Sequence, residues 1–259
     1  MSETTIRILS TRPLAAALLD QGKAHGMVID ARPFITTEPV TDETLGHRIL
    51  ELSTQPLVAV FTSMNAVEAV AQYLSSPATG PINQPSPPAI PWQVFCIGAA
   101  THQLIRDHFG EDRIAGTANS AAALAHVIIQ WNALTTGAPG SHIREVFFFC
   151  GDQRRDELPD QLRQASIKVN ELVVYRTLPT PCTIETVYDG IVFFSPSAVH
   201  SFFTRNTLPP ATILFAIGQT TADSIRAYTP NKTILSATPE KETLIRQVID
   251  YFQTNNIYY

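Results

Sequence analysis

The chain of 259 residues lacks the features that mark several large classes of protein. It has no uninterrupted apolar run of the ~18 residues that a membrane-spanning helix needs. Its first residues, MSETTIRILSTRP, lack the basic and then apolar pattern that is typical of an export signal. We therefore expect a cytoplasmic protein that is not associated with a membrane.

Cysteine is scarce, and the potential metal ligands are scattered. Cys96, Cys150 and Cys182 show no CxxC spacing, and the seven histidines form no HxxxH pair. Cys96 and Cys150 lie within apolar, strand-like runs, where a cysteine usually behaves as a small buried hydrophobic residue. The sequence therefore predicts no metal site.

Charge is also limited, because charged residues make up 16% of the chain and the formal net charge is −5. An acidic balance is not typical of a nucleic-acid-binding protein, so we expect no such partner. Neither GxGxxG nor GxxxxGK[ST] occurs, which argues against a nucleotide-binding enzyme. A small anionic ligand stays possible, since helix N-termini bind anions even on an acidic protein.

Short β-branched or aromatic runs alternate with longer amphipathic segments along most of the chain. This pattern predicts parallel sheets covered by helices on both faces, an α/β fold. The predicted strands are 6–9, 58–61, 93–97, 146–149, 169–174, 190–194 and 212–217. The predicted helices are 14–21, 65–74, 99–109, 121–131, 156–164, 197–204, 220–228 and 240–253, with one more amphipathic helix between 34 and 56.

The two halves of the chain repeat one another. AVFTSMNAVEAV (59–70) is similar to IVFFSPSAVHSF (191–202), and VFCIGAATHQLI (94–105) is similar to LFAIGQTTADSI (214–225). More weakly, IRILSTRPLAAALLDQG parallels VFFFCGDQRRDELPDQL. The order of the motifs is the same in both halves, so the sequence predicts two similar α/β domains.

Each repeated motif places hydroxyl groups where a predicted strand ends and a helix begins. Ligands of open α/β sheets bind at this edge, where helix N-termini also offer backbone N–H groups. Such serines and threonines are also the commonest helix N-caps, so a purely structural role is the competing interpretation. We expect two such edges to form a pocket for an anion. The residues that carry this expectation are Thr62, Ser63, Asn65, Thr101, Ser195, Ser197, Thr220 and Thr221.

These motifs, in this order, resemble the uroporphyrinogen-III synthase family. The resemblance runs from about residue 6 to 249 and rests on ILSTRP, VFTSMNAVEA, CIGAATHQL, VNELVVYRT, VFFSPSAVHSF and FAIGQTTADSI. Two departures are a proline-rich segment at 75–92, which reads as an exposed loop, and Ala165-Ser166, where relatives usually turn with glycine.

The family resemblance implies an interleaved domain arrangement. Residues 1–33 and 177–259 would form one domain, residues 38–170 the other, and the segments 34–37 and 171–176 a pair of antiparallel linker strands. From the residues alone, a simple tandem division near 137–140 is equally open. A monomer is the default expectation, because no heptad pattern is present.

The same resemblance implies a lyase reaction in tetrapyrrole and haem biosynthesis. Hydroxymethylbilane, a linear tetrapyrrole with eight carboxylates, would lose water, invert its terminal pyrrole ring and close to uroporphyrinogen III. The family uses no cofactor or metal. Tyr175 in VVYRT matches the tyrosine that would assist loss of the hydroxyl, and the hydroxyl residues above match positions that line the family's cleft. Arg12 and Arg155 are weaker candidates, because either could bind a carboxylate but both could instead be solvated or paired within the fold.

The competing function is a two-domain, hinge-closing protein that binds an anionic small molecule without chemistry. The repeat and the linker pair are compatible with it, whereas the missing export signal argues against a periplasmic version. A phosphate-receiver module is disfavoured, because it would need acidic residues where these strand ends carry serine and threonine.

Overall fold

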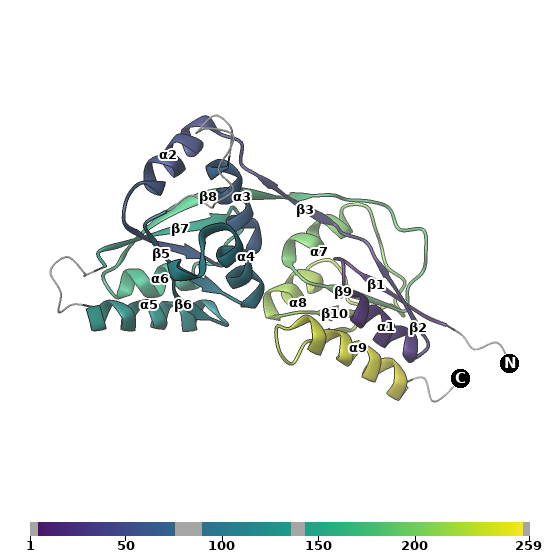
Figure 1. The fold of residues 1–259 in the computed structure, drawn as a ribbon. Helices are drawn as coiled ribbons and strands as arrows, with labels where there is room; N and C mark the ends of the chain where they lie inside the picture. The colour runs from purple at the N-terminus through teal and green to yellow at the C-terminus, as the bar shows by residue number, and fades with distance from the viewer. Residues whose placement is uncertain (1–4, 76–89, 136–142, 256–259) are drawn as a thin grey trace. The chain divides into compact units, whose positions relative to one another are not determined.

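The structure is a computed structural model that describes residues 5–75, 90–135 and 143–255. It divides the chain into two units, Met1–Thr36 with Leu178–Tyr259, and Thr37–Thr177. Among the described residues the strands form two sheets, one in each unit (Figure 1). Most of the segment 75–92 and the residues near 137–140 lie outside the described residues.

Unit 1, the unit that holds both ends of the chain, has a parallel sheet in the order β11-β10-β9-β1-β2. Its elements are β1 (Ile6–Ser10), α1 (Ala16–Ala24), β2 (Met27–Ala31), β9 (Gly190–Phe193), α7 (Pro196–Phe203), β10 (Ile213–Ala216), α8 (Gln219–Arg226), β11 (Thr233–Leu235) and α9 (Lys241–Asn255).

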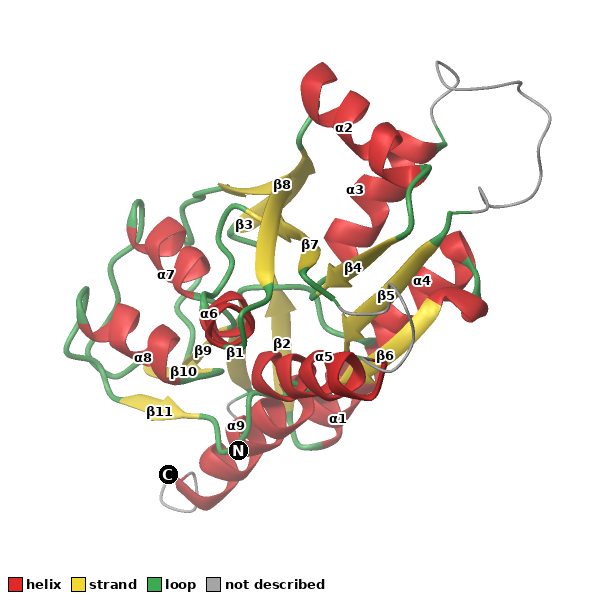
Figure 2. Cartoon of the chain, turned by 90° about the vertical axis from the view of Figure 1, so that its left-hand side faces the viewer, coloured by secondary structure: helices red, strands yellow, loops and turns green. Residues whose placement is uncertain are grey.

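Unit 2, the middle of the chain, has a sheet in the order β3-β8-β7-β4-β5-β6 (Figure 2). Its elements are α2 (Glu43–Ser53), β4 (Leu57–Phe61), α3 (Met64–Leu74), β5 (Trp92–Ile97), α4 (Ala99–Phe109), a 3-10 turn (Glu111–Arg113), β6 (Ile114–Ala118), α5 (Ala121–Thr135), β7 (Glu145–Gly151) and α6 (Glu157–Gln164). The strands β3 (Ile35–Pro39) and β8 (Lys168–Pro179) run from one unit to the other.

The strands β3 and β8 pair with opposite directions. Val40 N donates to Val174 O at 2.9 Å, and Thr180 N donates to Phe34 O at 2.9 Å. The residue number falls along β8 as it rises along β3, and this is the pattern of an antiparallel pair.

Alternate residues of the strands face opposite helical layers, because successive side chains of a strand point to opposite faces. In unit 2, Phe61 and Phe149 pack under α2, α3 and α4, whereas Val60 and Phe148 pack under α5 and α6. In unit 1, Phe193 faces α7 and α8, while the opposite face is covered by α1 and α9. The predicted two-domain α/β fold is confirmed.

Cys96 and Cys150 are buried, as the sequence predicts, and none of the three cysteines is in a disulfide. Burial raises the pKa of the Cys96 thiol to about 11 and that of the Cys150 thiol to about 12. Both therefore act as core residues rather than as nucleophiles.

The list of strands predicted from the residue patterns lacks β2, β6 and β11. Each lies at a sheet edge or is short, and each carries a polar or glycine residue within a weak apolar run, as in IAGTA of β6. Pairing with the neighbouring strand, rather than local composition, makes these segments extended. The predicted start of the last helix was also early, because α9 begins at Lys241.

Candidate functional site

Each sheet reverses its winding direction at one point of its own. The predicted residues that follow the strands at these points are Thr62, Ser63, Asn65, Arg12, Ser195 and Ser197, whereas Thr101, Thr220 and Thr221 follow the neighbouring strands β5 and β10. In unit 2 the chain runs outward from β4 through β5 to β6 and then returns to β7 on the other side of β4. In unit 1 it runs from β1 to β2 and then returns to β9 on the other side of β1. Crevices for ligands form beyond the carboxyl ends of the strands at such a switch point.

Ser63 stands at the switch point of unit 2, directly after β4. Its Oγ accepts a hydrogen bond from Ala66 N at 3.3 Å and so caps α3. The same Oγ donates to the phenol oxygen of Tyr175 at 3.2 Å. Ser63 therefore caps a helix and also contacts the phenol of Tyr175, whereas its contact with a ligand stays a prediction.

Tyr175 reaches this point because of Gly151, the last residue of β7. The register of β7 with β8 shifts here, so that Cys150 lies opposite Val173 but Gly151 lies opposite Tyr175. A Cβ atom at position 151 would come within 2.5 Å of the ring carbon Cζ of Tyr175. The aromatic ring therefore lies directly on the backbone of Gly151, and the shift in register directs it there.

Thr62 and Asn65 flank Ser63, and both are half-buried. Within the part of the chain that the structure describes, neither side chain makes a hydrogen bond. Since a polar group at this edge is either solvated or bound by a ligand, both side chains can accept or donate a further bond.

The switch point of unit 1 repeats the arrangement around Ser63. Ser195, directly after β9, accepts a hydrogen bond from Ala198 N at 3.2 Å and caps α7. Its Oγ lies 3.1 Å from the Oγ of Ser197. In the repeat Ser195 corresponds to Ser63 and Ser197 to Asn65, so the pair Ser195–Ser197 takes the place that Ser63 and Asn65 have in unit 2.

Arg12 follows β1 at the same switch point. Its guanidinium carbon lies 5.7 Å from the centre of the Phe194 ring, within the range of a cation–π contact. Partial burial lowers the pKa of Arg12. Burial also lowers the pKa of Lys241, the first residue of α9, and the charge of Arg12 lowers it further. Neither cation forms an ion pair with any described residue, and the charge of each acts on the other.

The predicted threonines differ in their exposure. Thr220 is exposed at the start of α8. The side chains of Thr101 and Thr221, each the third residue of its helix, are 5% and 1% exposed. Neither hydroxyl makes a hydrogen bond with a described residue, and neither is a fully buried unpaired atom, so each keeps some solvent-accessible surface. Arg155 is exposed, and its neighbour Arg154 forms the ion pairs of this loop with Asp156 and Glu171.

Sequence reasoning missed Gly151 and Lys241. GDQRRD was noted only as part of the repeat, and the packing of a tyrosine on its glycine depends on the register of β8. Lys241 carries no motif of its own. A cation in the first helical turn, where acidic residues are preferred, was the one available signal.

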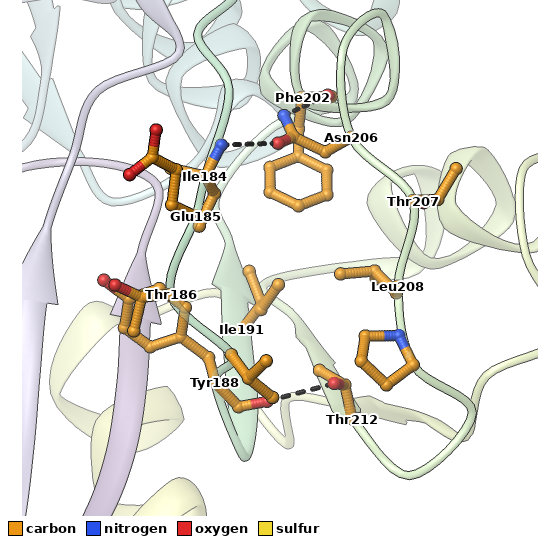
Figure 3. A pocket seen from close by; sticks show the side chains of 12 residues that line it. Ile184, Glu185, Thr186, Tyr188, Ile191, Phe202, Asn206, Thr207, Leu208 and Thr212 are labelled. Atoms are coloured by element: carbon orange, nitrogen blue, oxygen red, sulfur yellow. Dashed lines mark hydrogen bonds between the residues drawn. The ribbon is translucent and has the colours of Figure 1, made fainter.

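Two cavities of about 310 Å³ each lie elsewhere. One is in unit 2 around Asp42 and Tyr73. The other is in unit 1, at the amino ends of β9 and β10, the end opposite to Ser195 (Figure 3). The Asn206 amide there binds Ile184 N and Phe202 O, and Thr212 donates to Tyr188 O. These polar side chains are already satisfied, so we assign the cavity no role.

Within residues 5–75, 90–135 and 143–255, no three His, Cys, Asp or Glu residues lie close enough to hold a metal ion. No helix in these ranges combines the length and apolar character that would let it span a membrane.

Comparison with known proteins gives one consistent family. The family model described as uroporphyrinogen-III synthase HemD matches residues 14–246. The uroporphyrinogen-III synthase of Saccharomyces cerevisiae is 28% identical over 180 residues, which are 62% of this chain and 64% of that protein. That of Schizosaccharomyces pombe is 24% identical over 172 residues, which are 63% of this chain and 64% of that protein. The chain thus spans less than two thirds of either relative's length.

Solved structures share the fold. A uroporphyrinogen III synthase mutant from Thermus thermophilus matches with a TM-score of 0.56 and 15% identity, over 96% of this chain and 99% of that one. Uroporphyrinogen-III synthetase from Helicobacter pylori matches with a TM-score of 0.59 and 14% identity, over 95% and 99%. At these identities the matches establish the architecture alone.

We predict that Gly151→Ala destabilises the protein by about 1–3 kcal/mol, because the new methyl group overlaps the Tyr175 ring. Chemical denaturation measures this free energy. The matched control is Gly218→Ala, since a Cβ at Gly218 meets no atom within 4 Å and needs no positive φ. Equal stabilities of the two variants would contradict the packing of Tyr175 on Gly151.

Proposed function

Because the chain belongs to the uroporphyrinogen-III synthase family, we propose that it cyclises hydroxymethylbilane to uroporphyrinogen III. The reaction releases water and inverts the terminal pyrrole ring. The observation that carries the proposal is the hydrogen bond between Ser63 and Tyr175 at the switch point of unit 2, in a chain that the family model matches over residues 14–246.

The direction of that hydrogen bond supports a chemical role for Tyr175. Ser63 Oγ accepts from Ala66 N, and we assign its own hydrogen to the phenol oxygen. The phenol hydrogen is therefore left for another acceptor. We propose that it is donated to the hydroxyl of the bilane as that group leaves. The carbon–oxygen bond breaks, its electron pair leaves with the oxygen as water forms, and the positive charge stays on the bilane.

Binding of the carboxylates is assigned to the two strand edges. We propose direct contacts with Thr62, Asn65, Ser195, Ser197, Thr220 and Arg12, together with the backbone N–H groups that begin α3 and α7. Thr101 and Thr221 are largely buried, so we propose that only the small accessible part of their hydroxyls contributes to binding. The preorganised hydroxyls and N–H groups stabilise negative charge without requiring a basic protein.

We also propose that the two units are the two domains of the family, with the boundaries expected from the sequence, and that the protein is monomeric. A cytoplasmic location is supported by the three cysteines, none of which is in a disulfide.

The pairing of Arg12 with Lys241 predicts that Lys241→Gln weakens substrate binding. The KM for hydroxymethylbilane should rise about fivefold, since a partly exposed charge pair contributes up to ~1 kcal/mol. Arg246→Gln, which removes one positive charge from the same helix, is the control and should leave KM within twofold. A similar rise in both variants would show a general charge effect instead of a carboxylate site.

The proposal as a whole is tested by an isomer assay. Hydroxymethylbilane is generated in the presence of the purified protein, and the oxidised products are separated into porphyrin isomers I and III. We predict an excess of isomer III that depends on the protein. Isomer I alone, the product of spontaneous closure, would reject the synthase activity. A protein that binds tetrapyrroles without chemistry would then be the better interpretation.

A further inference from the structure

The loop that follows β7 holds the backbone on which Tyr175 sits. Asp152 N donates to Tyr175 O at 3.2 Å, and Asp152 Oδ1 accepts from Thr177 N at 2.9 Å. Asp152 therefore forms hydrogen bonds to β8 at two places, Tyr175 and Thr177. With Gly151 beneath the ring, these bonds fix both the backbone and the side chain of Tyr175.

The position of Asp152 is informative because of the repeat. In the alignment of IRILSTRPL with VFFFCGDQR, Asp152 corresponds to Arg12, so the same place in the two units carries opposite charges. The strand orders of the two sheets correspond as well. The order β8-β7-β4 in unit 2 matches β2-β1-β9 in unit 1, so that β7 corresponds to β1 and β4 to β9. Arg12 forms no ion pair among the described residues and is available to a ligand. The carboxylate of Asp152 instead accepts a hydrogen bond from the backbone of β8.

The contact of Asp152 requires an acceptor in the right place rather than a negative charge. Thr177 N is a neutral donor, and within the described residues the carboxylate of Asp152 forms no ion pair. An amide oxygen at the same position would satisfy Thr177 N equally well. A carboxylate displaced by one methylene group would not.

We propose that Asp152 is a positioning residue for Tyr175, and that it fixes residues 175–177 so that the phenol meets the hydroxyl of Ser63. The expected effect of Asp152 on kcat rests on the proposed function. Its expected effect on the position of the Tyr175 ring rests on geometry alone. The two halves of the repeat then differ in function at this position. Arg12 binds substrate in one half, and Asp152 orients Tyr175 in the other.

Two reciprocal substitutions test the inference. Asp152→Asn keeps the acceptor and removes the charge, whereas Asp152→Glu keeps the charge and displaces the acceptor. We expect the Asn variant to retain kcat within about twofold. We expect the Glu variant, like Asp152→Ala, to lower kcat about tenfold or more at an unchanged KM, since misplacement of a reacting group by about 1 Å costs up to ~100-fold. Asp160→Ala, which removes an exposed acid of α6, is the control for charge and folding.

A spectroscopic measurement separates this inference from the proposed function. The chain is labelled with 3-fluorotyrosine, and the ¹⁹F resonance of Tyr175 is assigned by its loss in Tyr175→Phe. The resonance should move in the Glu and Ala variants and stay in place in the Asn variant, whether or not the protein makes isomer III. An unmoved resonance in the Glu variant, or equal effects of Asn and Glu, would overturn the role of Asp152.

Discussion

The hydrogen bond between Ser63 and Tyr175 is the interaction on which the proposed site depends. It joins residues that are 112 positions apart in the chain, one at the end of β4 and the other on β8. Three conditions bring them together. The sheet order places β7 between these strands, the register of β7 with β8 shifts at Gly151, and the missing side chain of Gly151 leaves room for the ring. A change in any of them would separate the two hydroxyls.

Duplication explains why the site exists in two versions. Both units share the strand order around the switch point, and in both a serine after the inner strand caps the next helix. The copies then differ in what accompanies that serine. Unit 2 has a phenol that can donate a proton, and unit 1 has the cations Arg12 and Lys241. A fold that places helix N-termini at one edge can therefore present different polar groups at the same place in its two copies.

The sequence alone predicts much of this architecture, and the reasons are local. Strands such as β4 and β7 are continuous apolar runs, and serine before a helix is a strong capping signal, so Ser63 and Ser195 could be named. The edge strand β6 could not be recognised, because IAGTA lacks a strand-like pattern of its own. Tyr175 was named from the family resemblance alone, and its contact with Ser63 was not predicted, since no local pattern specifies it. Gly151, Asp152 and Lys241 act through register and packing, which depend on the folded sheet.

The most direct test of the central claim is a double-mutant cycle on Ser63→Ala and Tyr175→Phe, with kcat/KM for isomer III formation as the measured quantity. Ser120→Ala, which removes the serine that caps α5, controls for the loss of a helix cap alone. If the two hydroxyls act as a unit, the double variant will be little worse than the more impaired single variant, with a coupling energy of about 1–3 kcal/mol. Additive losses, with no coupling, would show that the hydrogen bond between Ser63 and Tyr175 has no part in the reaction.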